Sequence, residues 1–154
     1  MLPPGHLIDG RYEILGPLGA GGMGQIYRAR RVKLGDDVAL KALLSSEGGE
    51  EAAERFLRES RACAQLRHPN IVAILDFDVD AEGRPFLVME LLSGPSLRDE
   101  LDLGGALGPT HTLEVLDVVA SALQLAHDRG ITHRDLKPAN IVAHRSARGS
   151  ASTR

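Results

Sequence analysis

The stretch LGAGGMGQIYRAR, residues 18–30, decides the fold of this 154-residue chain. Its glycines follow the spacing G-x-G-x-x-G and include one extra glycine. Apolar and polar residues alternate before the glycines, in RYEILGPLG (11–19), and after them, in QIYRARRV (25–32), which predicts a strand on each side. The glycines therefore join two strands of a hairpin, and glycine-rich connections often bind phosphate groups.

Several kinds of loop share this glycine spacing. A dinucleotide-binding loop leads into a helix, whereas here a strand follows. A Walker A loop needs Gly-Lys-Ser/Thr, whereas Gly24 is followed by Gln25 and Ile26. A kinase loop lies between two strands, and a lysine follows on the next strand, as in VALK (38–41). The glycine spacing alone is also compatible with a flexible hairpin loop that binds no phosphate.

The composition excludes several classes of protein. A net charge of -3 gives no basic surface for nucleic acid, and the single cysteine, Cys63, allows no internal disulfide and suits a reducing compartment. No apolar run approaches the roughly 18 residues of a transmembrane helix, and the first residues lack a basic stretch followed by an apolar one. We therefore expect a cytoplasmic protein without a nucleic-acid partner and without a membrane segment in this chain.

The rest of the pattern predicts an α+β fold. Three further strands and one helix precede residue 93, and their short connections favour an antiparallel sheet. Two helices, one short and one long, come afterwards and lead to a loop. The expected strands are VALKALL (38–44), IVAILDFDV (71–79) and PFLVMELL (85–92), and the expected helices cover 45–68, ended by Pro69, then 96–101 and 112–130.

Six stretches of the chain resemble the bacterial serine/threonine protein kinases of the eukaryotic, or Hanks, type. They occur in the order of that family and cover about residues 11–142, and HRDLKPAN (133–140) is the most specific of them. The stretches are RYEILGPLGAGGMGQIYRAR, VALKAL, RFLRES, LRHPNIV, FLVMELLSGPSLRDEL and GITHRDLKPANIV.

The resemblance implies a kinase-like N-lobe, with five antiparallel strands and one helix, followed by an incomplete helical C-lobe. The expected parts are an irregular lead-in (1–10), the N-lobe and hinge (11–92), a partial C-lobe with the catalytic loop (93–143) and a disordered tail (144–154).

The resemblance also implies an activity. A kinase of this family binds ATP with Mg²⁺ and transfers the γ-phosphoryl group to a serine or threonine of a protein substrate. By position, Lys41 would hold the α- and β-phosphates and Glu59 would pair with Lys41. Asp135 would orient the substrate hydroxyl and accept its proton, Lys137 would steady the transferred phosphoryl group, and Asn140 would be a ligand of Mg²⁺.

The ATP pocket implied by the resemblance has three parts. Backbone amides of the glycine loop approach the phosphates, because glycine has no Cβ in the way, while apolar side chains cover the adenine and hinge backbone groups meet its edge. The loop residues are Leu18, Gly19, Ala20, Gly21, Gly22, Met23, Gly24, Gln25 and Ile26; Ala39 and Val142 join Leu18 and Ile26 as adenine walls, Met89 is the gatekeeper, and Glu90 and Leu92 form the hinge contacts.

The kinase pattern stops after Val142. No D-F-G follows, and the remaining AHRSARGSASTR contains no aspartate to hold a magnesium ion against the β- and γ-phosphates. Losing one preorganised electrostatic group often slows a reaction by about 10²- to 10³-fold. We therefore expect the chain alone to be inactive or nearly so. Two alternatives to a truncated kinase stay open: a non-catalytic ATP-binding or regulatory module, and a truncated gene fragment.

The long predicted helix has apolar residues on nearly all sides. Leaving three such side chains uncovered would forfeit about 5–9 kcal/mol of stability, which is comparable to the total for a domain. We therefore expect another kinase chain to cover the helix over 113–129, or the helix to be poorly ordered and to associate. The apolar residues are Leu113, Val115, Leu116, Val118, Val119, Leu123 and Leu125.

Overall fold

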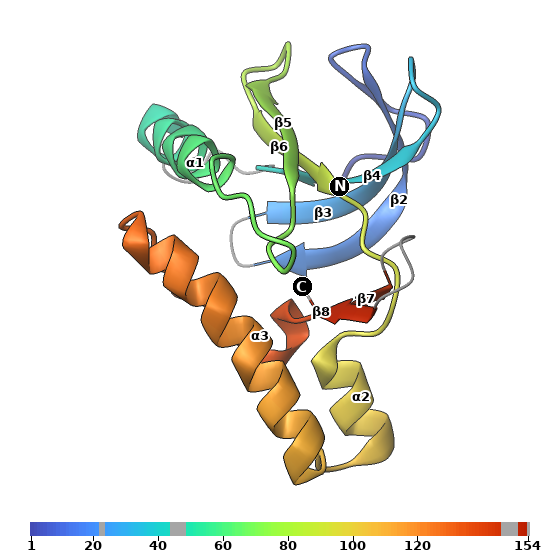
Figure 1. Ribbon diagram of the computed structural model, residues 1–154. Coiled ribbons are helices and arrows are strands. Elements are labelled where there is room, and N and C mark those ends of the chain that lie inside the picture. The colour runs from blue at the N-terminus through green and yellow to red at the C-terminus, as the bar shows by residue number, and fades with distance from the viewer. Residues whose placement is uncertain (22–23, 44–48, 146–150, 154) are drawn as a thin grey trace. The chain divides into compact units, whose positions relative to one another are not determined.

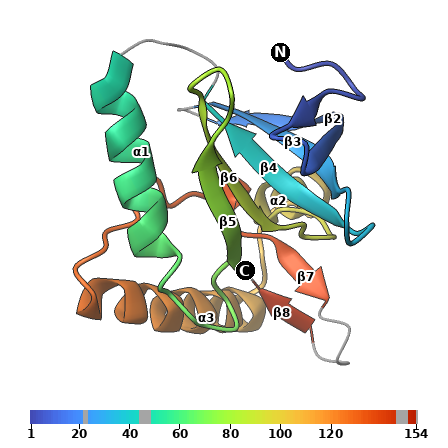
Figure 2. The same cartoon turned by 90° about the horizontal axis from the view of Figure 1, so that it is seen from above.

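The computed structural model describes residues 1–21, 24–43, 49–145 and 151–153, and the chain forms two compact units (Figures 1 and 2). Unit 1 comprises Met1–Gln65 and Ala73–Leu91, and unit 2 comprises Leu66–Val72 and Leu92–Arg154.

Unit 1 is a curled antiparallel sheet flanked by one helix. Its six strands follow the order β1-β2-β3-β4-β6-β5, and helix α1 contacts β5 and β6 (Figure 2). The expected strands and helix are all present, but the helix ends at Cys63, before the predicted end at Pro69, and β5 begins at Ile74, after the predicted start at Ile71. The first residues of the predicted helix, 45–48, lie outside the described residues. The bounds in unit 1 are β1 Leu7–Ile8, β2 Tyr12–Gly21, β3 Gly24–Arg31, β4 Asp37–Ala42, α1 Gly49–Cys63, β5 Ile74–Val79 and β6 Pro85–Glu90.

The core of unit 1 lies on one face of this sheet. Side chains alternate between the two faces of a strand, so Tyr27 and Ala29 of β3 point to the same face and are both fully buried. Leu40 and Val88 are directly opposite each other on β4 and β6, and both are fully buried as well. Aliphatic and aromatic side chains of five strands thus form a single core.

The first ten residues correct the prediction of an irregular lead-in and of a five-stranded sheet. Leu7 and Ile8 pair with β2 as a sixth strand, and Leu2 and Ile8 belong to the core. The backbone N–H of Leu2 donates to the hydroxyl of Tyr27 at 2.8 Å. A strand of two residues is too short to produce a detectable alternation, which is why the sequence pattern missed it.

The curl of the sheet brings β2 close to β5, although three strands separate them in the sheet order. The hydroxyl of Tyr12 donates to Oδ2 of Asp76 at 2.5 Å, and the Arg11 guanidinium contacts Asp76 at 2.8 Å and Asp78 at 2.9 Å. The Tyr12 ring also meets Phe86 edge-on at 5.8 Å. Burial, and then the hydrogen bond to Asp76, raise the pKa of Tyr12 to about 12.

Unit 2 consists of helices and short strands. The bounds are α2 Leu97–Gly104, α3 Pro109–Asp128, the 3-10 helix η1 Pro138–Asn140, β7 Ala143–Arg145 and β8 Ala151–Thr153. In the described part of the predicted tail, β8 pairs with β7 in an antiparallel ladder, and residues 146–150 and 154 lie outside the described residues. Such a ladder is made by backbone groups, so the small and polar residues of this tail carry no hydrophobic signal for it.

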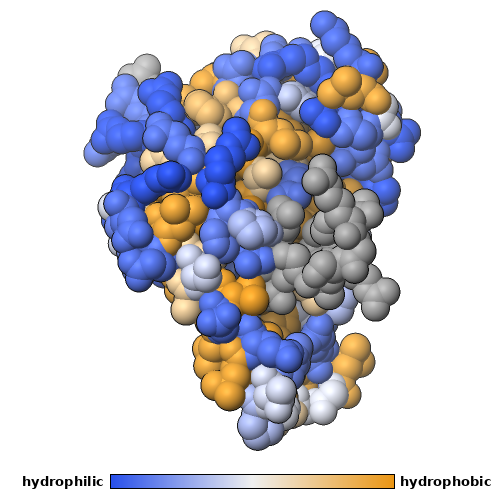
Figure 3. All heavy atoms as spheres, in the orientation of Figure 1, coloured by the Kyte–Doolittle hydropathy of each residue, from blue (hydrophilic) through white to orange (hydrophobic). Residues whose placement is uncertain are grey.

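Helix α3 exposes part of its apolar surface within unit 2. Val115 and Ala126 are buried, whereas Leu113 and Leu116 are 67% and 57% exposed. Hydrophobic residues accordingly reach the surface in the region of α2 and α3 (Figure 3). This exposure is expected for a helix that has apolar residues on nearly all sides and is therefore typical of a helix buried on every side. Across the described residues, no helix is both long and apolar enough to cross a membrane.

The raised pKa of Tyr12 predicts a loss of stability at high pH. An ordinary tyrosine has a pKa of 10.0, so the unfolded chain loses this proton first, and the folded state is penalised as the pH rises from 10.0 to about 12. We expect the free energy of unfolding to fall more steeply over this range in the wild type than in Tyr12→Phe, measured by urea unfolding at each pH. Parallel curves for the two proteins would contradict the prediction.

Candidate functional site

Four of the predicted pocket residues of unit 1 lie on one face of the sheet. Ile26 of β3 is directly opposite Lys41 of β4, and Ala39, two residues before Lys41, is directly opposite Met89 of β6. Cross-strand partners and residues two apart share a face, so these four side chains lie on the face opposite to Leu40 and the core. The register thus places the expected adenine walls and the gatekeeper beside the expected phosphate-binding lysine.

The glycine loop closes on the same strands. Gln25 donates from Nε2 to the carbonyl of Gly19 at 3.1 Å, which ties the two strands together below the tip. A Cβ on Gly24 would lie 2.5 Å from the carbonyl oxygen of Ala42, so this position accepts only glycine. Ala20 and Gly21 end strand β2, and the remaining predicted loop residues, Gly22 and Met23, lie outside the described residues.

The predicted ion pair between Lys41 and Glu59 is not formed. Both residues are described, Lys41 is partly exposed, and Glu59 is exposed on α1. Glu59 lies one turn before Cys63 on the helix, and burial, followed by the charge of Glu59, raises the pKa of the Cys63 thiol. The structure therefore provides the lysine and the glutamate on β4 and α1 without bringing their charged groups together.

The end of β6 is held by the segment before β5. Glu90 donates its backbone N–H to the carbonyl of Ala73 at 3.0 Å, and its Oε1 accepts from the N–H of Ala73 at 2.7 Å. These two bonds fix the chain beside Met89, where the predicted hinge begins. The other predicted hinge residue, Leu92, and the predicted adenine wall Val142 belong to unit 2.

In unit 2 the three residues predicted for the catalytic loop meet within one short segment. The Lys137 ammonium lies 2.9 Å from Oδ2 of Asp135. Nδ2 of Asn140 donates to the backbone carbonyl of Asp135 at 2.8 Å and to its Oδ2 at 3.1 Å. The preceding residue, Arg134, has a φ of 62°, a left-handed conformation that turns the chain sharply before Asp135. The loop is thus held in one geometry by its own polar groups.

These contacts also set the charge of the site. The hydrogen bond from Lys137, and then that from Asn140, hold the pKa of Asp135 below its ordinary value. Asp135 is therefore a carboxylate at neutral pH. Because the amide nitrogen of Asn140 is used on Asp135, its amide oxygen is the atom left for a ligand.

Two residues that the sequence reasoning passed over support this loop. Gly94 comes so close to β7 that a Cβ there would lie 2.0 Å from the carbonyl oxygen of Ala143. Ser96 caps α2 in a reciprocal capping box with Asp99, and it forms an antiparallel bridge with Val142. The S-x-x-D spacing at 96–99 is a recognisable signal for such a cap. Both contacts anchor the chain that follows Asn140.

Comparison with known proteins agrees with this geometry. The protein kinase domain family matches residues 12–149 of the chain. The chain belongs to the protein kinase family. The predicted fold, a kinase N-lobe followed by an incomplete helical lobe, is thereby confirmed, with one strand more than expected.

Named relatives of this kinase chain are bacterial serine/threonine kinases. It is 44% identical over 153 residues to serine/threonine-protein kinase pkn2 of Myxococcus xanthus, covering 97% of this chain and 18% of the relative. It is 41% identical over 143 residues to PknA of Mycobacterium tuberculosis, covering 90% of this chain and 33% of the relative. The chain therefore spans between about a fifth and a third of the length of these relatives.

Solved kinase structures share the fold. The kinase domain of Mycobacterium tuberculosis PknI matches with a TM-score of 0.76 at 32% identity, covering 99% of this chain and 61% of that one. A double mutant of the same domain matches with a TM-score of 0.80 at 31% identity, covering 99% of this chain and 62% of that one.

Protein kinases use ATP and Mg²⁺, and the described residues fit these groups in part. The face with Lys41 and Ala39 offers one ammonium group beside apolar walls, as a nucleotide needs. The amide oxygen of Asn140 is a hard oxygen ligand of the kind that Mg²⁺ prefers. Mg²⁺ also takes water and phosphate oxygens, so one protein ligand from this loop is compatible with its binding. No group of three acidic, histidine or cysteine side chains suited to a metal occurs among the described residues.

The local electrostatics of the catalytic loop predict how Asp135 titrates. Because Lys137 is the main cause of its lowered pKa, Lys137→Met should raise the pKa of Asp135 toward the ordinary value. The measurement is a pH titration of the carboxyl carbon of Asp135 by NMR. Arg98→Met, which removes a cation that pairs with Asp102 on α2, is the matched control and should leave the pKa of Asp135 unchanged. If the pKa of Asp135 were the same in Lys137→Met and in the wild type, Lys137 would not be the main cause of the lowered pKa.

Proposed function

We propose that this chain forms the ATP-binding lobe and the catalytic loop of a serine/threonine protein kinase. The observation that carries the proposal is the hydrogen-bonded cluster of Asp135, Lys137 and Asn140, in a chain of the kinase family. The kinase names of its relatives support the same reaction class.

The residues of unit 1 suit the binding of a nucleotide. The ammonium group of Lys41 would attract the α- and β-phosphates, and Ile26, Ala39 and Met89 would cover the adenine. The glutamate that fixes the lysine would be Glu59. Since the two charged groups are apart in this structure, α1 would have to move or Glu59 to change rotamer for the pair to form.

The residues of unit 2 suit the transfer step. Asp135, which stays ionised, would accept a hydrogen bond from the substrate hydroxyl and take its proton as the γ-phosphoryl group leaves ATP. Lys137 would stabilise the charge on the transferred group, and the amide oxygen of Asn140 would hold Mg²⁺. Mg²⁺ supplies positive charge that offsets the charge of the phosphates.

A further aspartate is needed to complete this reaction. In the family, the D-F-G aspartate holds Mg²⁺ on the β- and γ-phosphates, and no D-F-G occurs within these 154 residues. We therefore expect the 154-residue chain to bind nucleotide but to transfer phosphate very slowly. Phosphotransfer to serine or threonine would require the rest of the kinase domain that its relatives carry.

Nucleotide binding is tested with Lys41→Met. The substitution keeps most of the side-chain volume and removes the charge, so the affinity for ATP with Mg²⁺ should fall by about tenfold. The measurement is isothermal titration calorimetry on the 154-residue chain. Lys33→Met removes an exposed lysine between β3 and β4 and should leave the affinity unchanged. Equal affinities in Lys41→Met and the wild type would overturn the assignment of the pocket.

Catalysis is tested with a chimaera. Residues 1–142 would be joined to the remainder of the kinase domain of Myxococcus xanthus pkn2, which is 44% identical to this chain. We expect the chimaera to phosphorylate serine or threonine in a generic protein substrate, and Asp135→Asn to lower the rate by about 10²-fold or more. Thr132→Val is the control, because it alters the same loop and leaves Asp135 in place. Retained activity in Asp135→Asn would show that Asp135 is not the catalytic base.

A further inference from the structure

The row of residues that crosses the sheet at Lys41 extends to the edge strand β5. Lys41 of β4 is directly opposite Leu87 of β6, and Leu87 is directly opposite Phe77 of β5. Cross-strand partners share a face, so Lys41 and Phe77 stand on the same face of unit 1 with Leu87 between them. Neighbouring strands are about 4.8 Å apart, which places the backbones of Lys41 and Phe77 about 10 Å from each other.

Helix α1 reaches this row with a cation near its C-terminal end. Cζ of Arg61 lies 6.0 Å from the centroid of the Phe77 ring, a cation–π contact. The helix contacts β5 and β6, the strands that carry Phe77 and Leu87 (Figure 2). Within the described residues Arg61 forms no ion pair that would hold it elsewhere.

Glu59 and Arg61 flank the side of α1 that packs on the sheet. Ser60 lies between them in the sequence and is only 5% exposed, and Phe56, one turn earlier, is buried too. Successive residues of an α-helix are about 100° apart around its axis, so Glu59 and Arg61 project about 100° to either side of Ser60. One flank of the helix therefore carries a carboxylate, and the other carries a guanidinium group.

A roll of α1 about its axis moves these two flanks in opposite directions. When Glu59 descends toward the sheet, Arg61 rises from it. The 6.0 Å between Arg61 and the Phe77 ring is already at the outer limit of a cation–π contact, which is about 6 Å, so a small roll ends the contact. In the present orientation Arg61 is on Phe77 and Glu59 is apart from Lys41. The two contacts therefore belong to different orientations of the helix.

The packing of α1 on the sheet permits such a roll. Ser60 is buried, and Ala52 and Ala53 are half-buried, so small side chains make up much of this side of the helix. Small side chains make shallow ridges between packed elements, and a roll across them separates few atoms that are in contact. The orientation of α1 then depends on contacts at its flanks.

We propose that the contact between Arg61 and Phe77 is a latch, which holds α1 in the orientation that keeps Glu59 away from Lys41. This inference rests on the proposed function, in which Glu59 fixes Lys41 for the phosphates of ATP. Releasing Arg61 lets α1 roll, and Lys41 is then fixed before the nucleotide binds. Arg61 is thus a positioning residue that acts through Glu59 and not on the nucleotide itself.

The first test is the affinity of the 154-residue chain for ATP with Mg²⁺, measured by isothermal titration calorimetry. While the latch holds, only part of the population has the binding-competent orientation, so removing the latch should raise the affinity. A cation–π contact at an exposed site is weak, so Arg61→Gln and Phe77→Leu should each raise it by about two- to fivefold. Arg61→Lys keeps a cation for the ring and should stay near the wild-type value. Arg58→Gln removes another exposed arginine of α1 and is the matched control, with no change expected.

The second test follows the ion pair without any nucleotide. A nuclear Overhauser effect between the side-chain protons of Lys41 and Glu59 requires the two side chains to be close. We expect this NMR signal to be absent in the wild type and in Arg58→Gln, and to appear in Arg61→Gln and Phe77→Leu. Glu59→Gln/Arg61→Gln should lose the gain in ATP affinity, because the latch acts through Glu59.

Three results would overturn the latch. They are a signal that stays absent in both Arg61→Gln and Phe77→Leu, a lower ATP affinity in Arg61→Gln, and a gain in affinity that persists in Glu59→Gln/Arg61→Gln. A failure of the nucleotide assignment would be seen separately. If Lys41→Met bound ATP as the wild type does while the signal appeared in Arg61→Gln, the pocket assignment would fail and the latch on α1 would stand.

Discussion

The register between β3 and β4 is the constraint on which unit 1 depends. Ile26 is opposite Lys41, and side chains alternate between the two faces of a strand. The side chains two residues apart from this pair on either strand therefore also face away from the core. A slip by one residue would turn Lys41 toward the position of Leu40, which is fully buried, and would expose the aliphatic core to water. The core and the candidate nucleotide face are therefore two consequences of one pairing.

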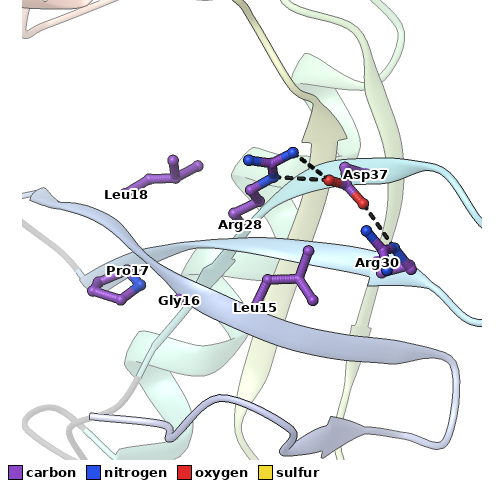
Figure 4. A pocket seen from close by; sticks show the side chains of 7 residues that line it. All are labelled: Leu15, Gly16, Pro17, Leu18, Arg28, Arg30 and Asp37. Carbon is purple, nitrogen blue, oxygen red and sulfur yellow. Dashed lines mark hydrogen bonds and ion pairs between the residues drawn. The ribbon is translucent and has the colours of Figure 1, made fainter.

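The same register also distributes the charged side chains along the candidate nucleotide face. Along β4, Lys41, Ala39 and Asp37 point to the same side, and Arg28 and Arg30 lie opposite Ala39 and Asp37 on β3. The face thus changes from a lone cation at one end to an arginine pair held by a carboxylate at the other (Figure 4).

The candidate catalytic loop is organised in another way. Its geometry comes from hydrogen bonds between residues at most five positions apart, which hold Asp135 ionised without burying it. A loop of this kind needs anchoring, and Gly94 and Ser96 supply it on the side that follows Asn140, through β7 and Val142. Local polar contacts and a few backbone anchors therefore replace a hydrophobic core at this site.

Alternation, helical periodicity and family motifs are readable in the sequence, so the kinase family, the longer strands and the α-helices of the described residues could be predicted from it. The residues proposed for the catalytic loop were named from the sequence as well. The tertiary structure adds that Leu2 and Ile8 join the core, since a two-residue strand has no readable period. It also decided that Glu59 stands apart from Lys41, because that contact depends on where a helix packs and on the rotamers of two long side chains.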